Sequence, residues 1–322
     1  MVGKRARIDG LVNKVHTNDC LKFLKRLPKQ SIDLCMTSPP YWRLRDYGKP
    51  GQIGQEKTPE EYIEKLLIIF RELKRVLKGT GSFYLNLGDT YIGTDSCREK
   101  TWKKSKQLAL LPARVAIALQ EDGWILRNDI CWYKPNCLPS SVKDRLTCRW
   151  EHVFHFVKQR KYYYNLDAIR EPLKASTIKR VRNRVKLHER TGRPFTAKSK
   201  YFGADHSQLG SSGFLSGKSL GRFKYLKGGN PGDFWAIAVK PLSMSHFAVY
   251  PEELCVRPIQ SSCPPGGIVL DLFAGSGTTL VAAKKLGRKF IGCDLNRVYV
   301  RLAKERLMAN GNTESLKRNN VR

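Results

Sequence analysis

Segments with strand-like and helix-like patterns alternate along most of this chain, and that alternation is the strongest constraint on its fold. A strand, a helix and a second strand are predicted between residues 8 and 42. Toward the C-terminus, a buried strand at 268–272 leads into a helix at 278–286, and a second pair follows at 289–308. Such alternation predicts an α/β protein with a wound sheet.

The charge balance indicates a polyanionic partner. The 322 residues include 59 Lys and Arg against 28 Asp and Glu, a formal net charge of +31. Each phosphate contact releases condensed counterions, so nucleic acid is the leading candidate. The alternative is a lysine-rich surface of the kind found in thermophilic proteins.

Other sequence features favour a cytoplasmic protein. The longest aliphatic or aromatic run, 66–70, is far short of the ~20 apolar residues that span a bilayer, and no apolar signal segment precedes it. The nine cysteines form no C-x-x-C pair and are expected to be reduced thiols. His152 and His155 lie on opposite faces of a predicted strand, so no metal site is expected.

Residues 174–229 differ in texture from the rest of the chain. They contain 14 Lys and Arg but only two acidic residues, with aromatic residues spaced among the cations and no clear period. The segment is either an element that contacts nucleic acid or a disordered basic loop. The candidate DNA contacts are Arg180, Arg182, Arg184, Lys186, Arg193 and Lys198.

The first candidate site is a glycine-rich turn, 271–279, placed where a strand leads into a helix. Glycines let a cofactor approach the backbone, and Asp294 at the end of the next strand has the position of an acid that binds ribose hydroxyls. The turn lacks the third glycine of dinucleotide sites, so a nucleoside without phosphate fits better. A side chain at Gly275 or Gly277 is expected to intrude on this cofactor. The alternative is a tight packing turn.

The second candidate site is Ser38-Pro39-Pro40-Tyr41, directly after a predicted strand. The Ser38 oxygen and the Pro39 carbonyl can accept hydrogen bonds from an exocyclic amino group, while Tyr41 offers a flat face for a planar base. Read alone, the two prolines are also a plain strand terminator. Together with a nucleoside-binding turn and a basic aromatic insertion, however, the tetrapeptide makes a third, independent signal that agrees with the other two on one activity.

The chain resembles the S-adenosylmethionine-dependent DNA amino-methyltransferases, in the branch whose catalytic motif precedes the cofactor motif. The resemblance rests on motif blocks that recur in order along nearly the whole chain. They are 37–41, 81–89, 132–135, 151–172, 247–254 and 271–306.

The resemblance implies a Rossmann-like seven-stranded sheet, helices on both faces and an inserted target-recognition region. The implied domains are a catalytic part at 1–172, the insertion at 173–235, a cofactor-binding part at 236–309 and a polar tail at 310–322. The implied catalytic residues are Ser38, Pro39, Pro40 and Tyr41. The implied cofactor-binding residues are Asp19, Pro251, Glu253, Asp271, Phe273, Gly275, Gly277, Thr278 and Asp294.

Serine in the first position of the tetrapeptide is usual in the family's cytosine-N4 enzymes, whereas Asp or Asn is usual in adenine-N6 enzymes. The expected reaction is therefore transfer of a methyl group to N4 of a flipped cytosine in double-stranded DNA. The remaining alternatives are an adenine-N6 enzyme, RNA or protein substrates, and a non-catalytic DNA-binding protein that keeps the fold. Cytosine-C5 chemistry is disfavoured because no Pro-Cys dipeptide occurs. The enzyme is expected to be either the modification part of a restriction–modification system, with a cognate restriction endonuclease as partner, or an orphan methylase. A monomer or weak dimer is also expected.

Overall fold

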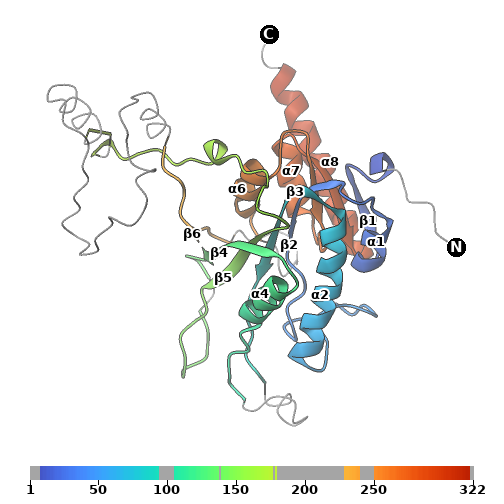
Figure 1. The fold of residues 1–322 in the computed structure, drawn as a ribbon, viewed down its shortest axis with the longest axis vertical. Coiled ribbons are helices and arrows are strands. Elements are labelled where there is room, and N and C mark those ends of the chain that lie inside the picture. The colour runs from blue at the N-terminus through green and yellow to red at the C-terminus, as the bar shows by residue number, and fades with distance from the viewer. Residues whose placement is uncertain are drawn as a thin grey trace. The chain divides into compact units, whose positions relative to one another are not determined.

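In the computed structural model, the described residues are 8–93, 105–137, 139–176, 178–179, 228–239 and 250–319. The chain divides into two compact units, residues 1–165 with 232–322, and residues 166–231. The first unit contains all strands of the sheet, drawn in Figure 1. In the second unit, the described residues include a short 3-10 helix, Leu166–Ala168, and a bridge between Glu171 and Gly229.

A single sheet forms the centre of the first unit, in the order β1-β8-β7-β2-β3-β5-β4-β6. All strands run in one direction except β5, which is antiparallel to both of its neighbours. The strands are β1 (Lys14–Thr17), β2 (Ile32–Thr37), β3 (Leu77–Leu87), β4 (Ile125–Tyr133), β5 (Trp150–Val157), β6 (Phe234–Ala236), β7 (Ile268–Asp271) and β8 (Lys289–Asp294).

The described sheet has eight strands rather than the expected seven. The additional strand is β6, which pairs in parallel with the outer side of β4 and buries Trp235. The expected boundary at residue 235 therefore falls inside a strand of the first unit. Three residues carry too little pattern to be recognised as a strand from sequence.

The helices lie in two groups, one on each face of the sheet. Helices α1 (Cys20–Arg26), α2 (Pro59–Val76) and α4 (Leu111–Glu121) contribute to one apolar core. Helices α6 (Glu252–Ser262), α7 (Thr278–Lys285) and α8 (Arg297–Asn319) contribute to the other. The backbone of α8 continues through most of the expected polar tail.

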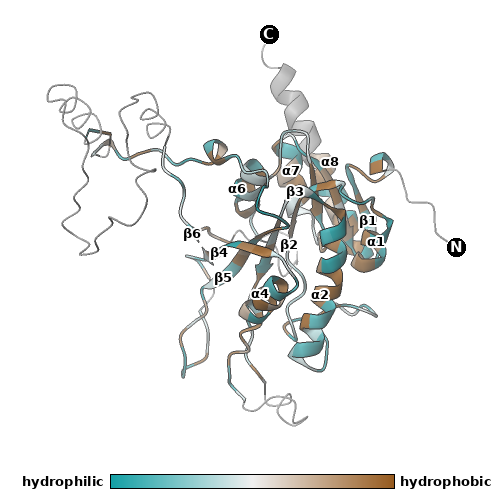
Figure 2. Cartoon of the chain, in the orientation of Figure 1, coloured by the Kyte–Doolittle hydropathy of each residue, from teal (hydrophilic) through white to brown (hydrophobic). Residues whose placement is uncertain are grey.

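Helix α2 shows how the sequence sets these elements. Thr58 Oγ1 accepts a hydrogen bond of 3.1 Å from the Glu61 backbone N–H, and the Glu61 carboxylate accepts one from Lys57 N–H. This capping arrangement satisfies the first donors of the helix, and Pro59 occupies its first turn. Polar and apolar residues alternate around α2 (Figure 2), as expected for a helix with one face on a core.

The two histidines of β5 face opposite sides of the sheet, as expected. His155 is buried, lies 3.1 Å from Ser82 Oγ and stacks on Tyr84, whereas His152 lies 2.8 Å from Asp129. Within the described residues, no cluster of three or more His, Cys, Asp or Glu side chains has the arrangement of a metal site. Among the described helices, none combines the length and apolar character needed to cross a membrane.

Candidate active site

The carboxyl ends of the parallel strands meet at one edge of the sheet, which is where open α/β sheets bind ligands. A cavity of about 580 Å³ lies at this edge. The glycine-rich turn after β7 and the tetrapeptide after β2 both line it. Two segments separated by more than 200 residues are therefore adjacent, because β2 and β7 pair directly.

The first half of the cavity is built around Asp294, at the end of β8. Its carboxylate accepts hydrogen bonds of 2.8 Å from the backbone N–H groups of Gly275 and Asn296. Burial raises the pKa of Asp294. Phe273 also lines this half. A carboxylate, a close-approaching glycine backbone and an aromatic face are the features that bind a nucleoside.

Asp271, expected among the cofactor-binding residues, is fully buried and does not line the cavity. Its carboxylate accepts hydrogen bonds of 2.6 Å from both Thr37 Oγ1 and Thr279 Oγ1. Tyr250 OH and Phe273 N–H donate to it as well. Burial raises its pKa to about 6, against the opposing effect of these hydrogen bonds. Asp271 thus ties the glycine-rich turn to the end of β2.

The two glycines of the turn have different surroundings. A Cβ built on Gly275 would meet nothing within 4 Å, and Gly275 lines the cavity. A Cβ built on Gly277 would lie 2.8 Å from Ala303 Cβ of α8, and its φ of +82° favours glycine. Of the two glycines expected to face the cofactor, only Gly275 thus lines the cavity, whereas Gly277 packs against α8.

Only some of the other residues expected to bind the cofactor line the cavity. Asp19 and Thr278 line the cavity. Pro251 and Glu253 do not, because the chain turns away into α6 after Tyr250, which does line it. The six candidate DNA contacts of the insertion lie outside the described residues.

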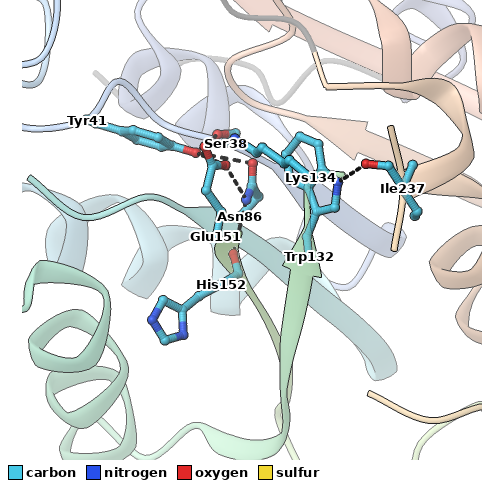
Figure 3. Close-up of polar contacts among 8 residues, drawn as sticks. All are labelled: Ser38, Tyr41, Asn86, Trp132, Lys134, Glu151, His152 and Ile237. Carbon is cyan, nitrogen blue, oxygen red and sulfur yellow. Dashed lines mark hydrogen bonds and ion pairs between the residues drawn. The ribbon is translucent and has the colours of Figure 1, made fainter. Parts of the chain in front are cut away.

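The second half of the cavity holds the tetrapeptide, all four residues of which line it. Ser38 Oγ lies 3.4 Å from Tyr41 OH, and Tyr41 OH donates a hydrogen bond of 2.8 Å to Glu151 Oε2 (Figure 3). Burial raises the pKa of Tyr41 far above its ordinary value, with the Glu151 charge as the second cause. The phenol therefore stays protonated and acts as a hydrogen-bond donor.

Two further contacts hold this loop in place. Tyr62 OH on α2 donates to the Pro40 carbonyl at 2.9 Å. A Cβ built on Gly88, just after β3, would lie 2.6 Å from the Tyr41 ring. Gly88 thus gives the ring the room it needs, and Tyr62 fixes the backbone that carries it.

Three polar residues of the cavity did not emerge as individual sites in the sequence analysis. Asn86 Nδ2 donates to Glu151 Oε2 at 3.1 Å, and Lys134 forms an ion pair with the other Glu151 oxygen. Lys134 and Glu151 are 19% and 17% exposed, so the pair is largely shielded from water. Lys134 Nζ also lies 4.4 Å from the centre of the Trp132 ring. The sequence feature that could have identified these three residues is their position at the ends of predicted strands.

Comparison with known proteins identifies the family of this chain. A family model described as DNA methylase, covering N6 and N4 methyltransferases, matches residues 32–305. The chain belongs to this family. It is 34% identical to the type II methyltransferase M.SfiI of Streptomyces fimbriatus, over 89% of each chain. It is 35% identical to M.SmaI of Serratia marcescens, over 92% of this chain and 90% of the relative.

Solved structures share the fold. The cytosine-N4-specific PvuII DNA methyltransferase matches with a TM-score of 0.62 at 21% identity, over 91% of this chain and 85% of that one. The protein TTHA0409 of Thermus thermophilus, solved in complex with S-adenosyl-L-methionine, matches with a TM-score of 0.55 at 24% identity, over 92% of this chain and 95% of that one. This DNA methyltransferase thus has the expected α/β architecture.

Proposed function

We propose that this DNA methyltransferase transfers a methyl group from S-adenosylmethionine to the exocyclic N4 of a flipped cytosine in duplex DNA. The observation that carries the proposal is that the glycine-rich turn and the Ser38–Tyr41 tetrapeptide line one cavity. A methyl donor in the first half and an amino group in the second would face each other within that cavity. Such positioning supplies most of the rate of a direct displacement.

The residues around the glycine-rich turn fit the cofactor. The Asp294 carboxylate can bind the ribose hydroxyls, and the Phe273 ring can contact the adenine. The open space at Gly275 lets the cofactor approach the backbone closely. When bound, S-adenosylmethionine supplies an electrophilic methyl group. Asp271 keeps the turn in position, because it bonds both Thr279 at the start of α7 and Thr37 at the end of β2.

The tetrapeptide would orient the target amino group. Ser38 Oγ and the Pro39 carbonyl accept its two hydrogens, which favours a pyramidal nitrogen with an available lone pair. The Tyr41 ring stacks on the base, held by Gly88 and by the hydrogen bond to Glu151. Ser38 is too weak a base to deprotonate the amine before transfer, and the methylated nitrogen loses its proton afterwards. The hydroxyls of Ser38 and Tyr41 form a path from the cavity to the Glu151 carboxylate.

Serine supports cytosine as the target. Its side chain is shorter than the Asp or Asn usual in adenine-N6 enzymes, so it suits a pyrimidine held close to the loop. The structural likeness to a cytosine-N4-specific enzyme supports the same choice. Adenine N6 is the alternative that the same cavity chemistry would allow.

The names of the relatives support a role in restriction–modification, in which the protein would protect DNA from a cognate endonuclease. We propose that it acts in the cytoplasm as a monomer or weak dimer. Residues 173–235, apart from the two that belong to β6, would serve as the target-recognition region, with the basic residues at 180–198 binding phosphates. Removing one such cation should lower the log–log salt slope of DNA binding by about one unit.

Methyl transfer from labelled S-adenosylmethionine tests the proposed activity. The protein is incubated separately with genomic DNA, double-stranded RNA and a protein mixture. Label should accumulate in the DNA alone, and Ser38→Ala should lower its rate of accumulation by about 100-fold. DNA binding without label in any sample would instead identify a non-catalytic DNA-binding protein.

A further inference from the structure

The loop between β4 and β5, residues 134–149, carries the most exposed large apolar side chain in the described part of the chain. Leu146 is 90% exposed, and Val142 and Trp150 nearby are 41% and 49% exposed. In Figure 1 this is the long light-green loop that leaves the ends of β4 and β5. Single exposed leucines are ordinary, so the surroundings of Leu146 must decide its meaning.

The loop is anchored close to Leu146 on both sides. Asp144 forms an ion pair of 2.6 Å with Lys106, and the Arg145 guanidinium lies 3.8 Å from the centre of the Tyr91 ring. Cys148 Sγ lies 3.7 Å from Tyr91 OH. Leu146 is thus exposed, while residues on both sides of it in the loop make contacts with Tyr91 and Lys106.

The stem of the same loop belongs to the cavity. Lys134 N–H donates to the Arg149 carbonyl at 2.8 Å, which closes the hairpin. Lys134, Asn136 and Cys137 line the cavity, and Asn136 bonds both backbone groups of Val239. The loop that carries Leu146 therefore begins at the half of the cavity that would receive the base.

The charge of the loop suits DNA. Lys143, Arg145 and Arg149 are exposed around Leu146, while the acidic residue Asp144 is paired with Lys106. Exposed cations can bind the phosphates of the DNA backbone, and an apolar side chain among them can contact the stacked bases. Apolar wedges that enter base stacks are an established way to unstack DNA.

We propose that Leu146 enters the DNA base stack beside the flipped cytosine and stabilises the flipped state. This inference rests on the proposed function, because it needs a base to leave the duplex. Flipping costs a few kcal/mol in lost stacking and pairing. Leu146 would offset part of that cost by filling the space that the base leaves, while the exposed Lys143 would contact a flanking phosphate.

The test compares Leu146→Ser with the wild-type protein on two synthetic duplexes. Their sequence is taken from genomic DNA that the wild-type protein has methylated. In one duplex the target base is normally paired, and in the other it lies opposite an abasic site, which makes flipping easier. Leu146→Ser should lower kcat/KM about tenfold on the paired duplex and much less on the abasic one. Leu146→Phe should retain activity.

Ile117→Ser is the matched control, since Ile117 is 54% exposed on α4 and lies outside the loop and the cavity. It should leave both rates unchanged. Equal losses for Leu146→Ser on the two duplexes, or no loss, would overturn the wedge while sparing the methyltransferase. Absence of transfer by the wild-type protein would overturn the proposed function itself.

Discussion

The hydroxyl of Tyr41 donates a hydrogen bond of 2.8 Å to Glu151 Oε2. It thereby joins the loop after β2 to the start of β5, two strands that are separated in the sheet by β3. Asn86 of β3 donates to the same oxygen at 3.1 Å. One carboxylate oxygen of β5 therefore accepts hydrogen bonds both from the loop after β2 and from β3.

Replacing residues of the tetrapeptide should separate catalysis from cofactor binding. Ser38→Ala should lower kcat by about 100-fold, because one acceptor for the amino group is lost. Tyr41→Ala should be more harmful than Tyr41→Phe, which keeps the ring and loses only the hydroxyl. Calorimetric affinity for S-adenosylmethionine should change little in all three variants. Wild-type turnover in Ser38→Ala would exclude its assigned role.

Glu151→Gln should lower kcat by about 100-fold with little change in cofactor affinity, because the amide neither pairs with Lys134 as an ion nor accepts a proton. Asp129→Asn is the control, since Asp129 pairs with His152 and does not line the cavity. If thermal unfolding shows that Glu151→Gln is destabilised, the double variant with Lys134→Gln removes the unpaired cation. Full activity in a folded Glu151 variant would refute the role of the carboxylate.

The two glycines of the turn should respond differently to alanine. Gly275→Ala should weaken S-adenosylmethionine binding at least tenfold, at a cost to stability of about 1 kcal/mol for its positive φ. Gly277→Ala should mainly lower the unfolding temperature, since its Cβ would collide with Ala303. Calorimetry and thermal unfolding on both variants measure the contrast. The reverse pattern would show that Gly277 faces the cofactor after all.

Asp271 should make stability depend on pH in a defined direction. Its pKa rises from 3.8 to about 6 on folding, so the folded state binds the proton more tightly than the unfolded state. From this group alone, the free energy of unfolding should fall by up to about 3 kcal/mol as pH rises through that interval, then level off. Denaturant unfolding of wild type and Asp271→Asn at several pH values checks this. A pH-independent difference between the two proteins would contradict it.

The sequence predicts much of this arrangement because strands and glycine-rich turns have local signatures. The tetrapeptide and Asp294 follow directly from strands with clear patterns, so their place at the carboxyl edge could be inferred. Glu151 and Lys134 meet only because antiparallel β5 lies between β3 and β4, and local patterns do not show that order. Likewise, the turn does not reveal that Gly277 faces α8, because Ala303 lies far along the chain.

The most direct test of the central claim is the identity of the methylated nucleoside. Genomic DNA treated with the wild-type protein and isotope-labelled S-adenosylmethionine is digested to nucleosides and analysed by mass spectrometry. The account predicts labelled N4-methylcytosine, formed about 100-fold more slowly when Ser38→Ala replaces the wild-type protein. Labelled N6-methyladenine without N4-methylcytosine would contradict it.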